Sequence, residues 1–160
     1  MVFYKYIKFL KKRFTLLFIF GLSWNIVQAN LVTNLVTYSN KKFLFSVNYP
    51  SNWSIKETPI SADTDLKLLQ IVFIDSKKNE VSIKIYPEKY RGFILESFNI
   101  FSQKEIMVGD IQGIQFNGIG HKSGSIPLFM YFITYRSLLF VFEGHNLKTL
   151  NKIVYSFVPF

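Results

Sequence analysis

The sequence contains no cysteine and only two histidines, His121 and His145. Without cysteine the chain has no disulfides, no thiolate metal sites, no thiol nucleophile and no lipid-modified cysteine. It also lacks the HExxH metal pattern, the GxSxG nucleophile turn and the dinucleotide-binding glycine motif. We therefore predict a protein that is not an enzyme and that has no catalytic residues, no metal site and no cofactor.

Glycine and proline are also scarce, whereas apolar and aromatic residues are abundant. Hydrophobic residues make up 49% of the 160 positions, and 18 Phe, 9 Tyr and 2 Trp make 18% of them aromatic. This content excludes disorder and supplies a substantial core, and aromatic side chains favour strands. The length suits about one domain and excludes a large multi-domain enzyme.

The first 29 residues differ from the rest and have the pattern of a secretory signal peptide. An uncharged apolar stretch, Phe14–Trp24, is followed by Val27-Gln28-Ala29, which closes the segment. A basic segment, an apolar stretch and a small residue before the cut define such signals. We predict cleavage between Ala29 and Asn30 and a single α+β domain over residues 30–160. The basic residues are Lys5, Lys8, Lys11, Lys12 and Arg13.

Two alternatives to a cleaved signal remain. Residues 14–32 (Phe14–Val32) approach the roughly 20 apolar residues of a membrane-spanning helix, but only by including Asn25, Gln28 and Asn30. The same segment could also be a helix buried in the protein. A cleaved signal and an uncleaved anchor both place the domain outside the cytosol, in the periplasm or secreted.

Most of the positive charge belongs to this N-terminal segment. The chain has 19 basic and 10 acidic residues, and removing five cations and no acids leaves 14 against 10, or +4. The precursor's basicity is therefore no sign of nucleic-acid binding, which needs a basic patch on the folded domain. We predict a protein partner, with a membrane surface as the alternative and no nucleic acid; the oligomeric state and the partner-binding residues stay unknown.

Period-2 alternation predicts strands, and period-3.6 patterns predict two helices. One helix is expected over Glu88–Ser102, with Ile94, Leu95, Phe98 and Phe101 as its apolar stripe. The other should begin at the cap Asn146, present Leu147, Leu150, Val154 and Phe157, and end at Pro159. The expected strands are 43–49, 53–55, 67–75, 80–87, 105–108, 111–121, 128–135 and 138–143.

The order of these elements predicts the fold class. Strands, a helix, strands and a second helix make an α+β protein, with an antiparallel β-sheet packed by two helices. Two hairpins are expected, around residues 76–79 and around Arg136-Ser137. The second hairpin, Leu128–Phe142, is apolar at nearly every position, so it is either covered on both faces or exposed to a partner at an edge. The glycines of Ile111–His121 suggest bulges or close backbone approach.

Three segments of the chain match sequence patterns of one known family. They are Phe45–Trp53 (FSVNYPSNW), residues 72–83 and residues 153–157 (IVYSF). In this order they resemble the "F-x-x-x-Y-P-x-x-W" opening, the first long hairpin and the "I-x-x-S-F" that ends many members of the PsbP-like/Mog1-like α/β/α sandwich superfamily. The resemblance spans about residues 43–157, although Tyr90–Val108 is short for the central helix region of the photosynthetic branch.

This resemblance implies a fold and a broad class of function. It implies a PsbP/Mog1-like sandwich and, for an exported chain, the exported bacterial branch of unknown role. Similar proteins are mostly binding or assembly factors and not enzymes. We therefore expect a non-enzymatic, exported binding or assembly-factor domain acting on a protein partner in the cell envelope.

An enzymatic or metal-binding alternative depends on the few residues suited to such chemistry. His121, His145 and Glu143 could supply three metal ligands to a small extracytoplasmic hydrolase or metal-binding protein. Asp63 and Asp65 could hold a hard cation. Asp110 and Glu143 are the candidates for a glycosidase carboxylate pair.

Basic residues around the first hairpin could form one surface. If they share a side of the domain, they could contact an anionic lipid or an acidic partner. The alternative is an ordinary solvated face. These residues are Lys77, Lys78, Lys84, Lys89 and Arg91.

Overall fold

The structure is a computed structural model, and it describes residues 34–59, 67–121 and 126–160. Residues from Asn34 onward form one compact unit. The predicted cleavage site at Ala29 and Asn30 and the candidate anchor over residues 14–32 lie outside the described residues, and they stay predictions. Within the described ranges, no helix has both the length and the apolar character needed to cross a bilayer.

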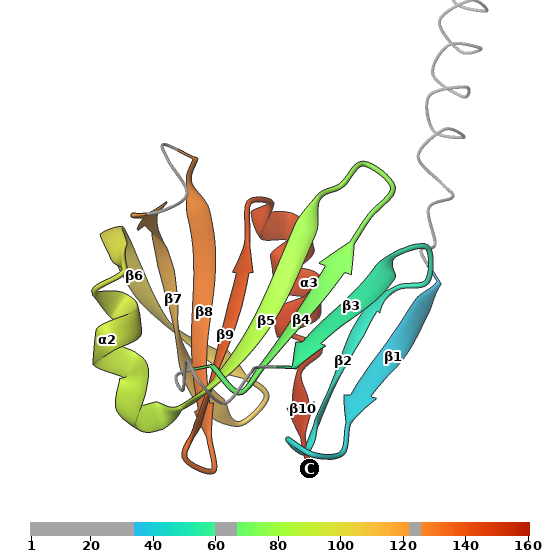
Figure 1. Cartoon of the computed structure of the whole chain (residues 1–160), viewed down its shortest axis with the longest axis horizontal. Coiled ribbons are helices and arrows are strands. Elements are labelled where there is room, and N and C mark those ends of the chain that lie inside the picture. Colours follow the sequence, from blue (N-terminus) through green and yellow to red (C-terminus); the bar gives the residue numbers. More distant parts are fainter. Residues whose placement is uncertain (1–33, 60–66, 122–125) are drawn as a thin grey trace, which may run out of the picture. The chain divides into compact units, whose positions relative to one another are not determined.

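A seven-stranded antiparallel sheet forms the centre of the domain (Figure 1). Both predicted hairpins are present, with turns at residues 75–79 and at Arg136-Ser137. In spatial order its strands are β3 (Ser54–Pro59), β4 (Leu69–Ile74), β5 (Glu80–Pro87), β9 (Leu138–Gly144), β8 (Leu128–Tyr135), β7 (Ile111–Gly120) and β6 (Phe98–Val108).

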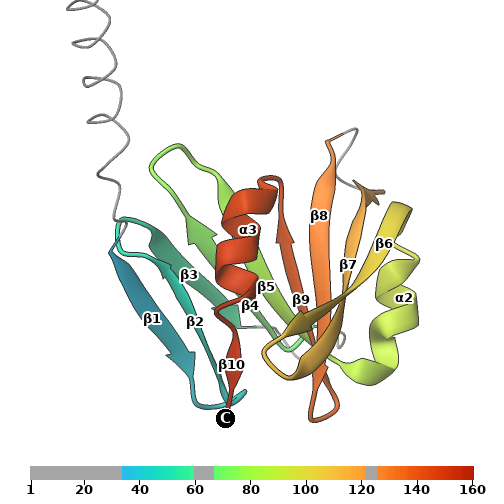
Figure 2. The same cartoon turned by 180° about the vertical axis from the view of Figure 1, so that it is seen from behind.

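A second layer covers one face of this sheet, which we call the α3 face. It consists of the helix α3 (Leu147–Val154) and a small sheet in the order β1 (Leu35–Asn40), β2 (Phe45–Pro50) and β10 (Val158–Pro159). Figure 2 shows α3 and β10 in front of the larger sheet. The larger hydrophobic core lies between these layers.

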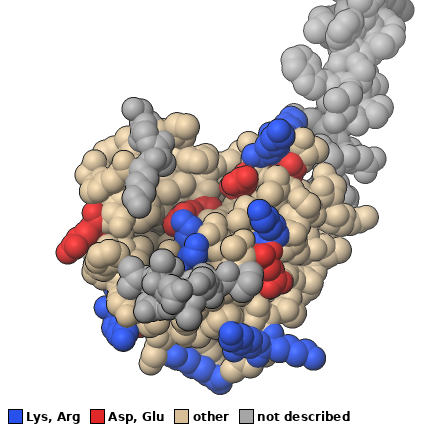
Figure 3. Space-filling view, viewed as in Figure 1, with Lys and Arg blue, Asp and Glu red and all other residues tan. Residues whose placement is uncertain are grey.

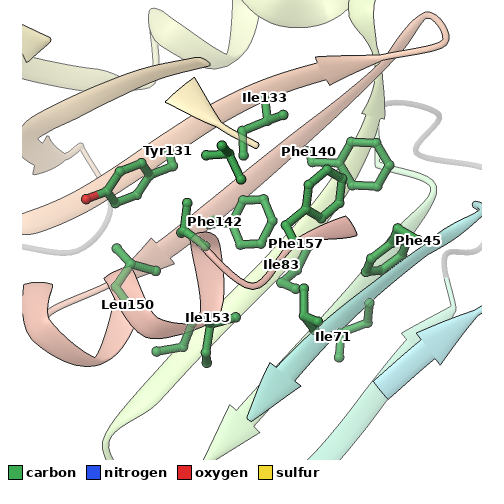
Figure 4. Packing of buried hydrophobic residues seen from close by; sticks show 14 of the residues in the cluster. Phe45, Ile71, Ile83, Tyr131, Ile133, Phe140, Phe142, Leu150, Ile153 and Phe157 are labelled. Carbon is green, nitrogen blue, oxygen red and sulfur yellow. The ribbon is translucent and has the colours of Figure 1, made fainter. Parts of the chain in front are cut away.

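Aromatic rings fill the middle of this core (Figure 4). The Phe157 ring lies 4.9 Å from that of Phe140, 5.5 Å from that of Phe142 and 5.8 Å from that of Phe45, measured between centroids. Tyr131 is fully buried beside them and its hydroxyl donates to Asn151 Oδ1 on α3. Burial raises the pKa of Tyr131 to about 12, because it disfavours the phenolate.

The opposite side of the sheet, which we call the α2 face, carries a second and smaller core. The 3₁₀ turn η2 (Glu88–Tyr90) leads into the helix α2 (Arg91–Leu95), whose Ile94 packs on side chains of β7, β8 and β9. An Arg91–Glu88 ion pair of 2.6 Å holds this turn, and both side chains bond to Thr134 on β8. The predicted α/β/α sandwich is therefore confirmed.

The apolar hairpin Leu128–Phe142 lies inside the sheet and not at its edge. Alternate residues of β8 and β9 belong to the larger and the smaller core. Phe142 and Phe140 point to the α3 face, whereas Val141 and Leu139 point to the α2 face. Of the two predictions for this hairpin, coverage on both faces is confirmed and a partner-facing edge is wrong.

The helix predicted over Glu88–Ser102 is wrong in its second half. α2 ends at Leu95, and the chain enters strand β6 at Phe98. Phe98 packs in the smaller core, but Phe101, the last member of the predicted stripe, is 62% exposed. β6 pairs with β7 over ten residue pairs and gains backbone hydrogen bonds from this pairing, and this tertiary gain overrides the local helical spacing.

The C-terminal helix begins as predicted and ends earlier. Asn146 caps it by accepting a hydrogen bond from the Thr149 backbone N–H at 3.1 Å. The helix stops at Val154 and Pro159 lies in β10, so Pro159 does not end it. Ser156 Oγ donates to Ile153 O and accepts from Asn48 N, both at 2.8 Å, which ties the helix end to β2.

Candidate functional site

Part of the α2 face is not covered by any helix of the described residues. Over β4, β5 and β9 it forms a depression of about 660 Å³, which we call the polar hollow. Its volume falls within the range of small-molecule and peptide side-chain sites. The lining residues are Gln70, Lys78, Asn79, Glu80, Ser82, Lys84, Leu128, Glu143, Gly144, His145 and Asn146.

The rim of the hollow is fixed by the β4–β5 turn. The Asp75 carboxylate accepts backbone N–H bonds from Lys77 at 2.7 Å and from Asn79 at 2.8 Å, and its other oxygen accepts the Asn79 amide at 2.7 Å. Hydrogen bonding from the Asn79 side chain holds the pKa of Asp75 below its usual value. Since Lys78 and Asn79 line the hollow, this turn positions one of its walls.

An ion pair forms the floor. Lys84 Nζ donates to Glu143 Oε2 at 2.6 Å, between the adjacent strands β5 and β9, and the two side chains are 23% and 11% exposed. Tyr86 lies on the same face of β5, and burial followed by the negative charge of Glu143 raises the pKa of its hydroxyl. The pair leaves neither of these two partly buried groups without an oppositely charged partner.

Lys67 adds a second half-buried cation beside this pair. Its Nζ donates to Gln70 Oε1 at 2.6 Å, which is a neutral acceptor. Burial lowers the pKa of Lys67, the positive charge of Lys84 lowers it further, and Glu143 opposes both effects. Lys67 is therefore an ammonium group that sits close to another ammonium group and bonds to an uncharged partner.

Removing the Lys84 charge is expected to destabilise the protein. In Lys84→Met the Glu143 carboxylate keeps its position and loses its only cation within hydrogen-bonding reach among the described residues. A polar group left unsatisfied in such a site costs about 1–3 kcal/mol. Urea unfolding of the full chain measures this change. The double variant Lys84→Met/Glu143→Leu should recover most of the loss, and equal losses in both variants would contradict the assignment.

The three residues proposed as metal ligands do not form a site. His121 Nε2 lies 3.1 Å from Asn99 Oδ1, His145 Nδ1 lies 2.8 Å from Pro127 O, and Glu143 is paired with Lys84. In the part of the chain that the structure describes, no three His, Asp or Glu side chains gather closely enough to hold a metal ion. Asp63 and Asp65 lie outside the described residues.

Asp110 and Glu143 are too far apart to act together as a glycosidase pair. Glu143 pairs with Met130, which pairs with Phe116 on β7, and Asp110 precedes Phe116 by six residues. At about 3.3 Å per residue this is about 20 Å along the strand. Glycosidase carboxylates lie about 5–9.5 Å apart, so the prediction that Asp110 and Glu143 form such a pair is wrong.

The predicted basic surface does not form a single patch. Lys77 and Lys78 are in the β4–β5 turn, whereas Lys89 and Arg91 follow the far end of β5. Arg91 and Lys84 are paired with carboxylates. Figure 3 shows positive and negative side chains interspersed on this side of the molecule. Of the five predicted cations, Lys78 and Lys84 line the hollow.

Sequence reasoning missed Gln70 and Ser82 as site residues. Alternation along the strands places Ser82 and Lys84 on one face, but pairing across β4, β5 and β9 is needed to bring Gln70 and Glu143 beside them. One signal in the sequence could have pointed to them. Polar residues occupy one side of β4 and β5, which are otherwise apolar, and such a pattern indicates a sheet face without a covering layer.

No protein-family model matches the chain, and no curated protein matches it in sequence. Among solved structures, the domain is similar to cyanobacterial PsbP (CyanoP) from Synechocystis sp. PCC 6803. The TM-score is 0.56 and the identity 11%, over 82% of this chain and 96% of that one. A protein of unknown function from Pseudomonas aeruginosa matches 74% of this chain and 87% of its own at 14% identity; its TM-score of 0.32 supports no argument.

The residues that carry the sequence resemblance have structural roles in the core. Phe45 and Val47 are fully buried, Trp53 packs against the same core, and Phe157 joins it from the other end of the chain. Ser156 ties α3 to β2. These positions pack the core and do not line the polar hollow. The domain therefore has the PsbP-like α+β fold that the resemblance predicts.

Proposed function

We propose that the protein is an exported, non-enzymatic binding or assembly-factor domain that acts on a protein partner in the cell envelope. The observation that carries this proposal is the polar hollow on the uncovered part of the α2 face. It presents hydrogen-bond donors, acceptors and charges of both signs, the set that matches a polar polypeptide segment. The PsbP-like fold and the signal-like N-terminus are consistent with this role.

The hollow is suited to recognition because several of its polar side chains are already held in place. Glu143 is fixed by Lys84, Asn79 by Asp75, and Asn146 by its capping bond to α3. Preorganised groups lose little conformational entropy when a partner arrives. An assembly factor that captures a partner segment needs this kind of fixed polar surface, and it needs no reacting group.

Partner capture in cells tests the binding role. We would place a photocrosslinking amino acid at Glu80, which is exposed and lines the hollow, and at Ser39, which is exposed on β1, as the matched control. The proposal expects one defined crosslinked protein with Glu80 and none with Ser39. Crosslinking to no protein at Glu80, or to the same proteins at both positions, would contradict it.

Export is tested by the intact mass and N-terminus of the protein recovered after cell fractionation. A species beginning at Asn30 in a soluble extracytoplasmic fraction is expected. Full-length protein in membranes would instead support a tethered domain whose N-terminal helix is kept, which is the second candidate. Full-length protein in the cytosol would overturn the exported role in either form.

A further inference from the structure

The outer edge of β6 carries backbone groups that no other strand of the described residues pairs with. β6 is eleven residues long, contains no proline and pairs on one side only, with β7. The strand at the opposite edge of the sheet, β3, is six residues long and ends in Pro59, which has no backbone N–H to donate. A long open edge of this kind can pair with an added strand.

The turn between β6 and β7 determines which backbone groups face outward. This turn is two residues long, and Val108 pairs with Ile111 across it. The pair that flanks such a turn exchanges both of its backbone hydrogen bonds, and from there the bonding direction alternates along the strand. Every second residue of β6 therefore points its N–H and C=O away from β7. In the regular part of the strand these residues are Gln103, Glu105 and Met107.

Two adjacent residues of this edge carry opposite charges on opposite faces of the sheet. Lys104 alternates with Ile106 and Val108, which belong to the larger core, so it lies on the α3 face. Glu105 pairs with Ile114 of the smaller core and lies on the α2 face. Both charged residues are exposed, and neither has an ion-pair partner in the described part of the chain.

A second copy of the chain cannot neutralise these charges at this edge. Two-fold symmetric pairing of β6 with its own copy runs antiparallel and keeps each set of side chains on its own face. Along residues 102–108, the α3 face carries no acidic residue and the α2 face carries no basic residue, and residues 98–101 are uncharged. The bulge between Ile100 and Ser102 also interrupts a longer pairing.

A strand from another protein satisfies both charges when its sequence is complementary. Running antiparallel to β6, it places a basic residue opposite Glu105 and, as its next residue, an acidic residue opposite Lys104. Opposite charges that face each other across two strands stabilise the pairing, whereas like charges destabilise it. Two positions before its basic residue, the added strand faces Met107, which is 57% exposed. An apolar side chain at that position would cover Met107.

We infer that the outer edge of β6 binds an extended segment of a partner protein as an added antiparallel strand. In this segment an apolar residue is followed two positions later by a basic residue and then by an acidic one. Backbone bonds to Gln103, Glu105 and Met107 supply affinity, and the two charges supply specificity. None of the residues 103–107 lines the polar hollow, so this inference goes beyond the proposed function and does not depend on the hollow.

Binding of a defined peptide tests the inference. The full chain is titrated with the fluorescent peptide Thr-Val-Ile-Lys-Glu-Thr-Thr, capped at both ends, and anisotropy gives Kd. The control peptide has its lysine and glutamate exchanged, which keeps its composition and net charge. It should bind about tenfold more weakly, because like charges then lie opposite Glu105 and Lys104. The protein variant Lys104→Glu/Glu105→Lys should reverse this preference. Both positions are exposed, so the fold is retained.

A third peptide tests the backbone pairing itself. N-methylation of the peptide lysine removes the N–H that would donate to the Glu105 carbonyl and leaves both charges in place. This peptide should bind at least about tenfold more weakly than the unmodified one. Equal binding of these two peptides would overturn strand pairing, and equal binding of the two charge orders would overturn the predicted sequence.

Further outcomes separate the other occupants and the two proposals. A full chain that sediments as a dimer, with crosslinks between the β6 strands of two copies, would assign the edge to a second copy and overturn the inference. If Glu80 crosslinks to a partner and no peptide binds, the inference fails while the proposed function stands. Peptide binding with the expected charge order, without a partner crosslinked at Glu80, gives the reverse.

Discussion

Replacing Phe157 with alanine is expected to lower the free energy of unfolding by about 3–5 kcal/mol, the usual range for a buried phenylalanine. Phe157 is 3% exposed, and its ring touches three other aromatic rings that come from β2 and β9. Its removal leaves a cavity in the larger core, between the seven-stranded sheet and the layer that covers its α3 face. The neighbouring aromatic rings are rigid and fill such a cavity poorly. Urea unfolding followed by tryptophan fluorescence measures the change.

Phe160→Ala is the matched control for this experiment. Phe160 lies three residues further along and is 49% exposed, although its backbone N–H donates to Leu44 O at 2.9 Å. Alanine keeps that backbone bond and removes mainly solvent-exposed surface, so the expected change stays within about 0.5 kcal/mol. A similar loss in both variants would show that the C-terminal segment, and not the aromatic cluster, determines the stability.

The second large effect is expected from Gly118→Ala, with a loss of about 2–3 kcal/mol. A Cβ atom at Gly118 on β7 would clash with the backbone carbonyl oxygen of Asn99 on β6. This contact lies beside the bulge where the register between β6 and β7 shifts, between Ile100 and Ser102. Because the obstacle is backbone and not a movable side chain, β6 has to shift, and overpacking of this kind is destabilising.

Gly92→Ala distinguishes this clash from a general effect of removing glycine. Gly92 lies in α2 and has no atom within 4 Å of a built Cβ. Alanine is the better helix former by about 0.5–1 kcal/mol, so Gly92→Ala should be neutral or slightly stabilising. Thermal or urea unfolding of both variants tests the pair. A Gly118→Ala protein as stable as the parent would contradict the close approach of the two strands.

The glycines of β7 show how far sequence reasoning reaches. Three glycines in one predicted strand indicated bulges or close backbone approach. The structure confirms this at Gly118, and at Gly113 a Cβ would lie 3.1 Å from Phe132 O. Only the end of the partner strand β6 was predicted, at residues 105–108, because its first residues follow a helical spacing. The local pattern therefore identified the crowded strand but not the part of β6 that approaches it at Gly118.

The small sheet shows a second limit of prediction from the sequence. Strand β1 was not predicted, although Val36 and Tyr38 alternate with Thr37 and Ser39. Most of β1 is exposed, so its apolar pattern is weak, and it exists because β2 supplies its hydrogen bonds over six residue pairs. β10 is two residues long and depends on β2 in the same way. Strands stabilised by a partner and not by burial leave little signal in the sequence.

The sequence by itself determined the fold class, both hairpins and the cap of the last helix, because alternation, turn residues and capping act over a few neighbouring positions. Only the tertiary structure decided the site. Lys84 and Glu143 are 59 residues apart in the chain and meet because β5 pairs with β9. The pairing of β9 with β8 and of β8 with β7 places Asp110 far from Glu143. Which residues share a sheet face depends on strand order and register, and these are set by the packing of the whole core.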